Sequence, residues 1–140
     1  MSCYLDANVL VALLVPEALS TRADVFLTAN RDLYVVSNLA AAEFSSAISR
    51  RVRMSEMSLA DGRLALSGFD SWVGLSAERV EIAAADIDRA DGILRRLDLP
   101  LVTPDAIHIA IAQRIAATLV TFDRQMAASA RALGMAVATP

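Results

Sequence analysis

The chain has 140 residues, of which 56% are hydrophobic, and a formal net charge of −3. A chain of this length buries a core large enough to be stable without disulfides or a structural metal, so we expect a single domain spanning residues 1–140. One cysteine and one histidine exclude a disulfide framework, a zinc finger and a Cys/His metal cluster, so any metal chemistry is expected to use oxygen ligands.

Short apolar strands alternate with longer helical stretches along the whole chain. We predict strands at residues 2–5, 33–36, 79–82, 118–121 and 135–138, and helices at residues 7–15, 18–30, 38–53, 59–73, 87–97, 104–116 and 124–133. This alternation is typical of an α/β fold, in which helices cover both faces of a central parallel sheet. Ligands bind such sheets beyond the carboxyl ends of the strands, where the strand order reverses.

No apolar run approaches the roughly 18 or more residues that a membrane span requires. The apolar segment from Val9 to Val15 is too short, and it follows an aspartate instead of a basic stretch, so a secretory signal is not expected. We therefore expect a cytoplasmic protein that makes no membrane contact.

Four acidic residues stand where this architecture brings distant segments together: Asp6, Glu43, Asp105 and Asp123. Asp6 and Asp123 each follow an apolar strand, and Asp105 follows a Thr-Pro pair that is typical of a helix start, with the threonine as N-cap. Glu43 lies at the edge of an apolar helix stripe, between core and solvent. Gathered carboxylates repel one another unless a cation lies between them, so the set predicts a divalent-cation site.

Each of these acids also has a simpler explanation. The three aspartates are typical of helix caps or first turns, and Glu43 is also typical of a solvated helix surface. Their joint occurrence favours the metal site. By contrast, we expect Asp86 to be the N-cap of the helix at residues 87–97 and the other acids near it to be solvated surface charges: Asp88, Asp91 and Asp98.

Four segments together resemble a known family. They are residues 5–10 (LDANVL), 42–43 (AE), 103–108 (TPDAIH) and 121–124 (TFDR), and their order and spacing resemble PIN domains, specifically the ribonuclease toxins of VapBC toxin–antitoxin pairs. The resemblance implies a three-layer sandwich with a parallel five-stranded sheet, an endoribonuclease activity that depends on Mg²⁺ or Mn²⁺, a homodimer and a small antitoxin partner. It places the acidic quartet of the family on the same four acids, with supporting polar positions at Asn8, Thr121 and Ser37.

Hard cations such as Mg²⁺ and Mn²⁺ prefer oxygen ligands, keep several waters and bind substrate phosphate. A metal held by Asp6 and Asp105 would activate water and polarise a phosphodiester, while Glu43 and Asp123 complete the site or orient the attacking water. Setting these four acids aside leaves 12 acidic residues against 13 arginines, so the net charge argues neither for nor against an RNA substrate.

Substrate contacts are predicted at Arg50, Arg51 and Arg53, near the end of the helix that carries Glu43, and at Arg124. The first three are equally typical of a helix C-terminus, where the dipole favours cations. His108 shares the helix face of Asp105 and is expected either to be a buried, hydrogen-bonded core residue or to orient the site.

An apolar stripe lies on the helix at residues 59–73 and near it: Met54, Met57, Leu59, Leu66, Phe69, Trp72 and Val73. It predicts core packing together with a groove for a partner helix.

Other classes of protein share parts of this pattern. A phospho-accepting receiver domain and a haloacid-dehalogenase-like phosphatase also carry an aspartate at the end of a strand, but both resemble families that use a lysine near the phosphate, and this chain has no lysine. The phosphatase pattern also requires an aspartate where Asn8 stands. A non-catalytic PIN-like module that binds RNA or protein remains the alternative.

Overall fold

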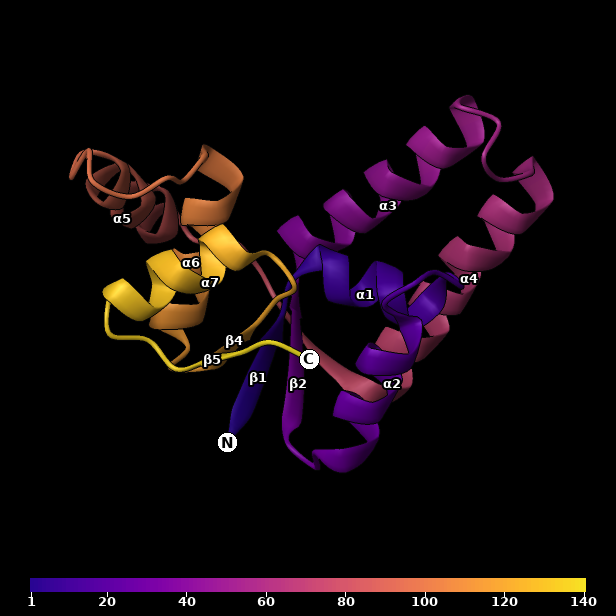
Figure 1. Ribbon diagram of the computed structural model, residues 1–140, viewed down its shortest axis with the longest axis horizontal. Helices are drawn as coiled ribbons and strands as arrows, with labels where there is room; N and C mark the ends of the chain where they lie inside the picture. The colour runs from indigo at the N-terminus through magenta and orange to yellow at the C-terminus, as the bar shows by residue number, and fades with distance from the viewer.

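The computed structural model describes all 140 residues (Figure 1). Its strands and helices in chain order are β1 (Ser2–Leu5), α1 (Ala7–Leu14), α2 (Ser20–Ala29), β2 (Leu33–Ser37), α3 (Asn38–Arg53), α4 (Leu59–Ser76), β3 (Ala77–Val80), α5 (Ala84–Leu94), α6 (Thr103–Arg114), β4 (Thr118–Val120), α7 (Arg124–Ala132) and β5 (Val137–Ala138). The five strands form one sheet in the order β3-β2-β1-β4-β5, and every pairing is parallel. The predicted fold class is confirmed.

Helices cover both faces of the sheet, with α1 to α4 on one side and α5 to α7 on the other (Figure 1). Successive strand residues point to opposite faces, so each strand contributes to two cores. On β1, Leu5 packs in the core beneath α1, α3 and α4, whereas Tyr4 packs in the core beneath α5, α6 and α7. This alternation makes the central strands apolar along their whole length, as expected for a parallel sheet buried on both faces.

The strand order reverses between β1 and β4. From β1 the chain proceeds to β2 and β3 on one side, and it then returns to place β4 and β5 on the other. The carboxyl ends of β1 and β4 are therefore neighbours, and a crevice between them is where an open α/β sheet binds its ligand. Backbone pairing continues to this edge, since Asp6 N donates to Val120 O over 3.0 Å.

The boundaries of several elements differ from the sequence prediction. Helix α4 runs to Ser76 instead of residue 73, so β3 begins at Ala77 instead of residue 79. Helix α6 begins at Thr103, and its N-cap is Val102, which offers no side-chain hydrogen bond; the prediction that Thr103 is the cap is wrong. The Thr-Pro pair lies inside the first helical turn, where proline is tolerated because its missing N–H has no intrahelical partner.

Asp86 also differs from its predicted role. Helix α5 begins at Ala84, so Asp86 lies in the first turn and is not the N-cap. Its carboxylate accepts a hydrogen bond from Ala83 N over 2.8 Å and two from the guanidinium of Arg114, over 2.8 and 2.9 Å. The Asp86 side chain is 1% exposed. This buried ion pair joins α5 to α6, whereas the neighbouring acids predicted to be solvated are exposed: Asp88, Asp91 and Asp98.

None of the helices combines the length and the apolar character that crossing a bilayer requires.

Candidate metal centre

Asp6 lies at the carboxyl end of β1, and its side chain is buried and held by two hydrogen bonds. Oδ1 accepts from Ala7 N over 2.7 Å, which caps α1, and Oδ2 accepts from the Thr121 hydroxyl over 2.8 Å. Burial raises the pKa of Asp6; the neighbouring His108 and the Thr121 hydrogen bond oppose this rise, and the charge of Glu43 adds to it. A carboxylate in this position is stabilised by any cation that reaches it.

Thr121 and Asn8 tie the ends of β1 and β4 together. Thr121 Oγ1 accepts from Asn8 Nδ2 over 3.2 Å and from Asp123 N over 3.0 Å, and it donates to Asp6. Asn8 Oδ1 in turn accepts from Phe122 N over 3.2 Å. Of the three predicted supporting residues, Thr121 contacts a carboxylate directly, Asn8 acts through Thr121, and Ser37 caps α3 through Ala40 N.

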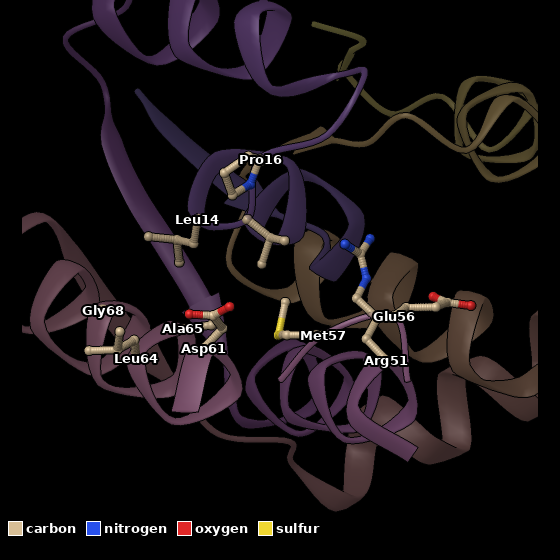
Figure 2. Close-up of a pocket in the computed structure, with 10 residues that line it drawn as sticks. Leu14, Pro16, Arg51, Glu56, Met57, Asp61, Leu64, Ala65 and Gly68 are labelled. Carbon is tan, nitrogen blue, oxygen red and sulfur yellow. The ribbon is translucent and has the colours of Figure 1, made fainter. Parts of the chain in front are cut away.

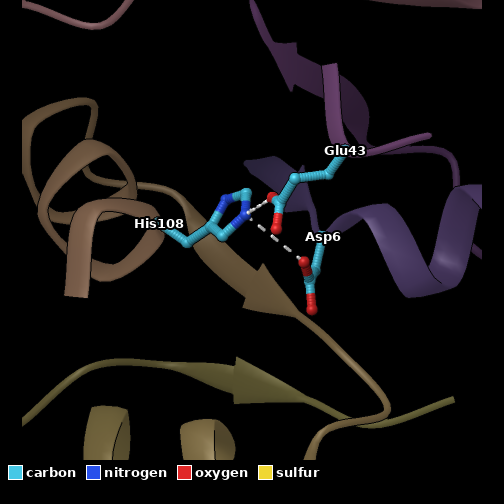
Figure 3. Close-up of side chains that lie close together, drawn as sticks. All are labelled: Asp6, Glu43 and His108. Carbon is cyan, nitrogen blue, oxygen red and sulfur yellow. Dashed lines mark hydrogen bonds and ion pairs between the residues drawn. The ribbon is translucent and has the colours of Figure 1, made fainter. Parts of the chain in front are cut away.

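Asp6, Glu43 and His108 form a compact cluster in which one potential ligand atom from each residue lies within 4.8 Å of the others (Figure 3). His108 Nε2 lies 3.6 Å from Asp6 Oδ1 and is hydrogen-bonded to Glu43 Oε1. The carboxylates come from β1 and α3 and the imidazole from α6, so three layers of the fold meet here. Sequence reasoning expected oxygen ligands, and the structure places a ring nitrogen beside the two carboxylates.

Asp105 and Asp123 lie outside this cluster of three. Asp105 is half-buried in the first turn of α6, where burial and then the charge of Asp123 raise its pKa. Asp123 is the N-cap of α7, and its Oδ1 accepts from Gln125 N over 2.9 Å and from Met126 N over 3.0 Å. The structure therefore pairs Asp6 with Glu43, and it leaves Asp105 and Asp123 near enough to act through their charges.

His108 is both buried and part of the site. Its side chain is 1% exposed, and its Nδ1 is hydrogen-bonded to the Tyr4 hydroxyl over 2.6 Å. Burial lowers the pKa of His108, but the hydrogen bond to Glu43 and the nearby carboxylates outweigh burial and hold the pKa above its ordinary value. The two roles that the sequence left open for His108 are thus compatible.

The donor set fits a hard divalent cation. Asp6 and Glu43 present carboxylate oxygens to one point, and such oxygens are the ligands that hard cations prefer. The Glu43 side chain is 36% exposed, so the cluster opens to solvent on the side of α3. No arginine forms an ion pair with Asp6 or Glu43, so arginine does not neutralise the negative charge of these two carboxylates.

Three of the four predicted substrate-binding arginines lie in the last turn of α3, and the fourth lies at the start of α7. Arg51 is half-buried and paired with Glu17 over 3.0 Å, and it lies away from the acids. Arg53 is exposed and donates to Ser49 Oγ over 2.6 Å, and Arg50 is exposed near the same end of α3. Arg124 is exposed in the first turn of α7, next to Asp123.

A hollow of about 510 Å³ lies apart from the acidic cluster, between the end of α1 and the hairpin formed by α3 and α4 (Figure 2). Apolar and charged side chains line it together, among them Leu14, Pro16, Met57, Leu64, Arg51 and Asp61. Of the predicted apolar stripe, Phe69 and Val73 are buried in the core, and only Met57 lines the hollow.

Residues 3–132 match the family model described as PIN domain. The chain belongs to the PIN-domain family. The match covers β1 to α7 and therefore contains all four acids. The predicted family is confirmed, and the fold agrees with it.

Comparison with known proteins identifies related PIN-domain proteins. The chain is 34% identical to Ribonuclease VapC46 of Mycobacterium tuberculosis over 140 residues, covering 98% of this chain and 96% of that protein. Its fold is similar to that of Mycobacterium tuberculosis VapC20, a sarcin-ricin loop cleaving toxin, with a TM-score of 0.75, 19% identity and coverage of 99% of both chains. It is also similar to a chain in the structure of VapBC2 from Rickettsia felis bound to a promoter DNA fragment, with a TM-score of 0.73, 18% identity and coverage of 99% and 98%.

Tyr4 is the residue of this site that sequence reasoning missed. It lies on β1, fully buried, and its hydroxyl is hydrogen-bonded to both His108 and Ser37. The available signal was its position: a buried tyrosine needs a partner for its hydroxyl, and this one stands two residues before Asp6 in an otherwise apolar strand.

Proposed function

We propose that this PIN-domain protein is an endoribonuclease that requires Mg²⁺ or Mn²⁺ and serves as the VapC-type toxin of a toxin–antitoxin pair. The observation that carries the proposal is the convergence of Asp6 and Glu43 at the reversal point of the sheet. The likeness to Ribonuclease VapC46 along nearly the whole of both chains supports the activity and the RNA substrate.

Asp6, Glu43, Asp105 and Asp123 are the residues that we assign to the metal centre. A bound Mg²⁺ or Mn²⁺ supplies a Lewis acid that polarises the phosphodiester and lowers the pKa of its water. Asp6 is the anchor, because two donors already fix its carboxylate before any ligand arrives. Asp105 provides a second carboxylate across the crevice.

Glu43 and Asp123 have a different role in this mechanism. Glu43 would bind the cation beside Asp6 and, as the more exposed member of the compact cluster, would also orient the incoming water. One carboxylate oxygen of Asp123 caps the N-terminus of α7, and the charge of Asp123 completes the acidic set around the crevice. The N-termini of α1, α6 and α7 converge on this edge, and their positive ends favour both the carboxylates and a substrate phosphate.

RNA is expected to reach the crevice past arginines that neutralise its phosphates. Arg124 is the best placed, because it follows Asp123 directly and is exposed. Arg50 and Arg53 extend the contact along α3. Arg51 contributes less, since its guanidinium is already paired with Glu17.

The relatives and the hollow of Figure 2 support the proposed partner assembly. Several structural neighbours were solved as toxin–antitoxin or VapBC complexes. We assign the hollow to the small cognate antitoxin, because a lining that combines apolar side chains with Arg51, Glu56 and Asp61 suits an amphipathic segment. A cytoplasmic homodimer built from a single domain per chain completes the proposal.

Digestion of total RNA tests the proposal. The purified protein should cleave RNA with Mg²⁺ or Mn²⁺, stop in chelator, and lose cleavage in the Asp6→Asn variant. Expression of the chain alone should arrest growth, and coexpression of the short reading frame beside it should restore growth. RNA binding without cleavage under all metal conditions, by wild-type protein and variant alike, would instead establish the non-catalytic binding module.

A further inference from the structure

A chain of buried hydrogen bonds leads from the start of α3 to the acidic cluster. Ser37 Oγ accepts from Ala40 N over 3.0 Å, and it lies 2.6 Å from the Tyr4 hydroxyl. The same hydroxyl lies 2.6 Å from His108 Nδ1, and His108 Nε2 is bonded to Glu43. Tyr4 and Ser37 are 0% exposed and His108 is 1% exposed, so water does not reach the three linking side chains.

Counting donors and acceptors fixes the direction of this chain. Ser37 Oγ already receives the hydrogen of Ala40 N, and the Tyr4 hydroxyl is its other partner, so the Ser37 hydrogen is satisfied only by Tyr4. Tyr4 then donates its own hydrogen to His108 Nδ1. In the neutral ring, with Nδ1 as an acceptor, the ring proton resides on Nε2, which donates to Glu43.

The reverse direction leaves a buried group without a partner. If His108 Nδ1 carried the proton, Tyr4 would accept from it and donate to Ser37, which also accepts from Ala40 N. The Ser37 hydroxyl hydrogen would then be buried without an acceptor. An unsatisfied buried donor is costly, so the observed contacts favour the first direction.

This direction bears on what His108 can bind. A metal ligand must present a lone pair, and on Nε2 that position is occupied by the proton that faces Glu43. Nδ1 is turned away from the acids and is bonded to Tyr4. His108 is therefore a donor to Glu43, although its distance from the carboxylates is short enough for a ligand.

Glu43 is the carboxylate that most needs support. It has three rotatable side-chain bonds, it is 36% exposed, and it lies beside a buried carboxylate that repels it. Asp6, in contrast, is fixed by Ala7 and Thr121. Without an added donor, ordering Glu43 costs side-chain entropy each time a cation binds.

We propose that His108 is a positioning residue: the Ser37–Tyr4–His108 chain fixes the imidazole so that its Nε2–H holds the Glu43 carboxylate beside Asp6, and the ring itself does not bind the cation. The inference rests on the proposed metal centre, and it adds Tyr4 and Ser37 to the residues that prepare that centre. Groups that orient metal ligands typically change metal affinity by about 10–100-fold when removed.

The two tyrosines of the chain provide a matched pair of variants. Tyr4→Phe removes only the hydroxyl that links Ser37 to His108. Tyr34→Phe removes the other tyrosine hydroxyl, which donates to the backbone carbonyls of Leu27 and Asn30 over 3.0 and 2.9 Å, away from the site. By calorimetry with Mn²⁺, we expect Tyr4→Phe to weaken binding about 10–100-fold and Tyr34→Phe to change it less than about twofold.

Nitrogen NMR of the ring provides a direct readout, because His108 is the only histidine. In wild-type protein, at a pH alkaline enough for a neutral ring, Nε2 should carry the proton and Nδ1 should not, and addition of Mg²⁺ should leave this unchanged. Tyr4→Phe should keep the proton on Nε2, where the Glu43 carboxylate accepts it, but should shift the Nδ1 signal because the hydrogen bond from Tyr4 is lost, whereas Tyr34→Phe should match the wild type.

Two results would overturn the inference. The first is loss of the Nε2 proton on addition of Mg²⁺, which would make His108 a ligand. The second is equal Mn²⁺ affinity in the two tyrosine variants while wild-type binding is intact. Failure of the wild-type protein to bind either cation would instead refute the proposed metal centre, and the NMR signals of the metal-free protein would still report on the direction of the chain.

Discussion

Thr121 donates its hydroxyl hydrogen to Asp6 Oδ2 over 2.8 Å and so joins the carboxyl ends of β4 and β1. The oxygen of the Thr121 hydroxyl also accepts hydrogen bonds from Asn8 Nδ2 and from the backbone N–H of Asp123. One hydroxyl therefore fixes a carboxylate, the first turn of α1 and the turn that leads into α7. The geometry of the crevice is therefore expected to depend on this hydroxyl.

Thr121→Val tests this dependence. Valine keeps the branched shape but removes the hydroxyl, which leaves Asp6 with one donor fewer and Asn8 without its acceptor. We expect metal affinity and cleavage to fall about 10–100-fold and the free energy of unfolding to fall by about 1–3 kcal/mol. Calorimetry with Mn²⁺ and urea denaturation measure the two effects. Thr121→Ser, which retains the hydroxyl, should recover most of both; failure of serine to do so would assign the effect to packing.

Asp6→Asn and Asp105→Asn should abolish cleavage, with losses above about 100-fold, because each removes a charged oxygen ligand. In the absence of metal, the free energy of unfolding should rise or change by no more than about 1–2 kcal/mol, since relief of carboxylate repulsion offsets the lost hydrogen bonding. Magnesium should raise the melting temperature of the wild type but not of the variants. Full activity in either variant would remove that residue from the metal centre.

The metal-free protein should become more stable on mild acidification. Burial raises the pKa of Asp6 and of Asp105 above their ordinary value of 3.8, so the folded protein binds these protons more tightly than the unfolded chain does. Their contribution to stability is complete below that ordinary value and is lost as the pH rises through the raised one. Urea denaturation should therefore give a higher free energy of unfolding at about pH 5 than at about pH 8.

Two controls accompany this pH dependence. Magnesium should reduce it, because the cation competes with the protons, and Asp6→Asn should make it shallower. At lower pH the trend should reverse: burial raises the pKa of Asp86, but the Arg114 hydrogen bonds outweigh burial and hold it below its ordinary value, so its stabilisation is lost as the pH falls through that lowered value. Stability that increased steadily with pH up to neutrality would contradict the raised pKa of Asp6.

The buried pair between Asp86 and Arg114 should be important for stability but not for chemistry. Arg114→Gln leaves a carboxylate that is 1% exposed without its cation, and we expect a loss of about 2–4 kcal/mol in the free energy of unfolding. The matched control is Asp91→Asn, which breaks the exposed pair with Arg95 and should cost less than about 1 kcal/mol. Cleavage by folded protein should be unchanged in both variants; a selective loss in Arg114→Gln would connect α5 to the site.

The proposed antitoxin surface can be tested without disturbing the nuclease. Leu64→Asp places a charge in the hollow at a position that is 69% exposed, and it should weaken the complex with the product of the adjoining reading frame at least about tenfold, or 1.4 kcal/mol. Leu75→Asp alters an exposed leucine of the same helix that does not line the hollow. Binding measured by interferometry should separate the two variants, whereas RNA cleavage by the free proteins should not. Equal binding would place the partner elsewhere.

Most of the fold was predictable because its signals are local and repeated. Each central strand is a short apolar run between turn residues, and the parallel arrangement follows from the alternation with helices. The errors occurred where the competing signals were weak. Gly74 is typical of a helix end, yet α4 continues past it to Ser76, and α5 starts at an alanine pair without a capping side chain, so Asp86 was the nearest plausible cap.

The site was predictable only in part. Asp6 and Asp123 could be placed because they follow strands, whose ends meet at one edge of a parallel sheet. The proximity of His108 to Glu43 depends on how α6 packs against α3, which no sequence period encodes. Arg51 differs from Arg50 and Arg53 because it forms an ion pair with Glu17. This pair could not be predicted either, because Glu17 lies in a loop whose path the sequence does not determine.

The insertion of β4 beside β1 means that the first and last parts of the chain complete one another. During translation, Asp6 gains its second hydrogen-bond donor only after Thr121 has left the ribosome. The set of four acids is complete only after Asp123 has left it. A nuclease that attacks RNA is thus harmless during most of its own translation. Shortened products of interrupted synthesis should be harmless for the same reason.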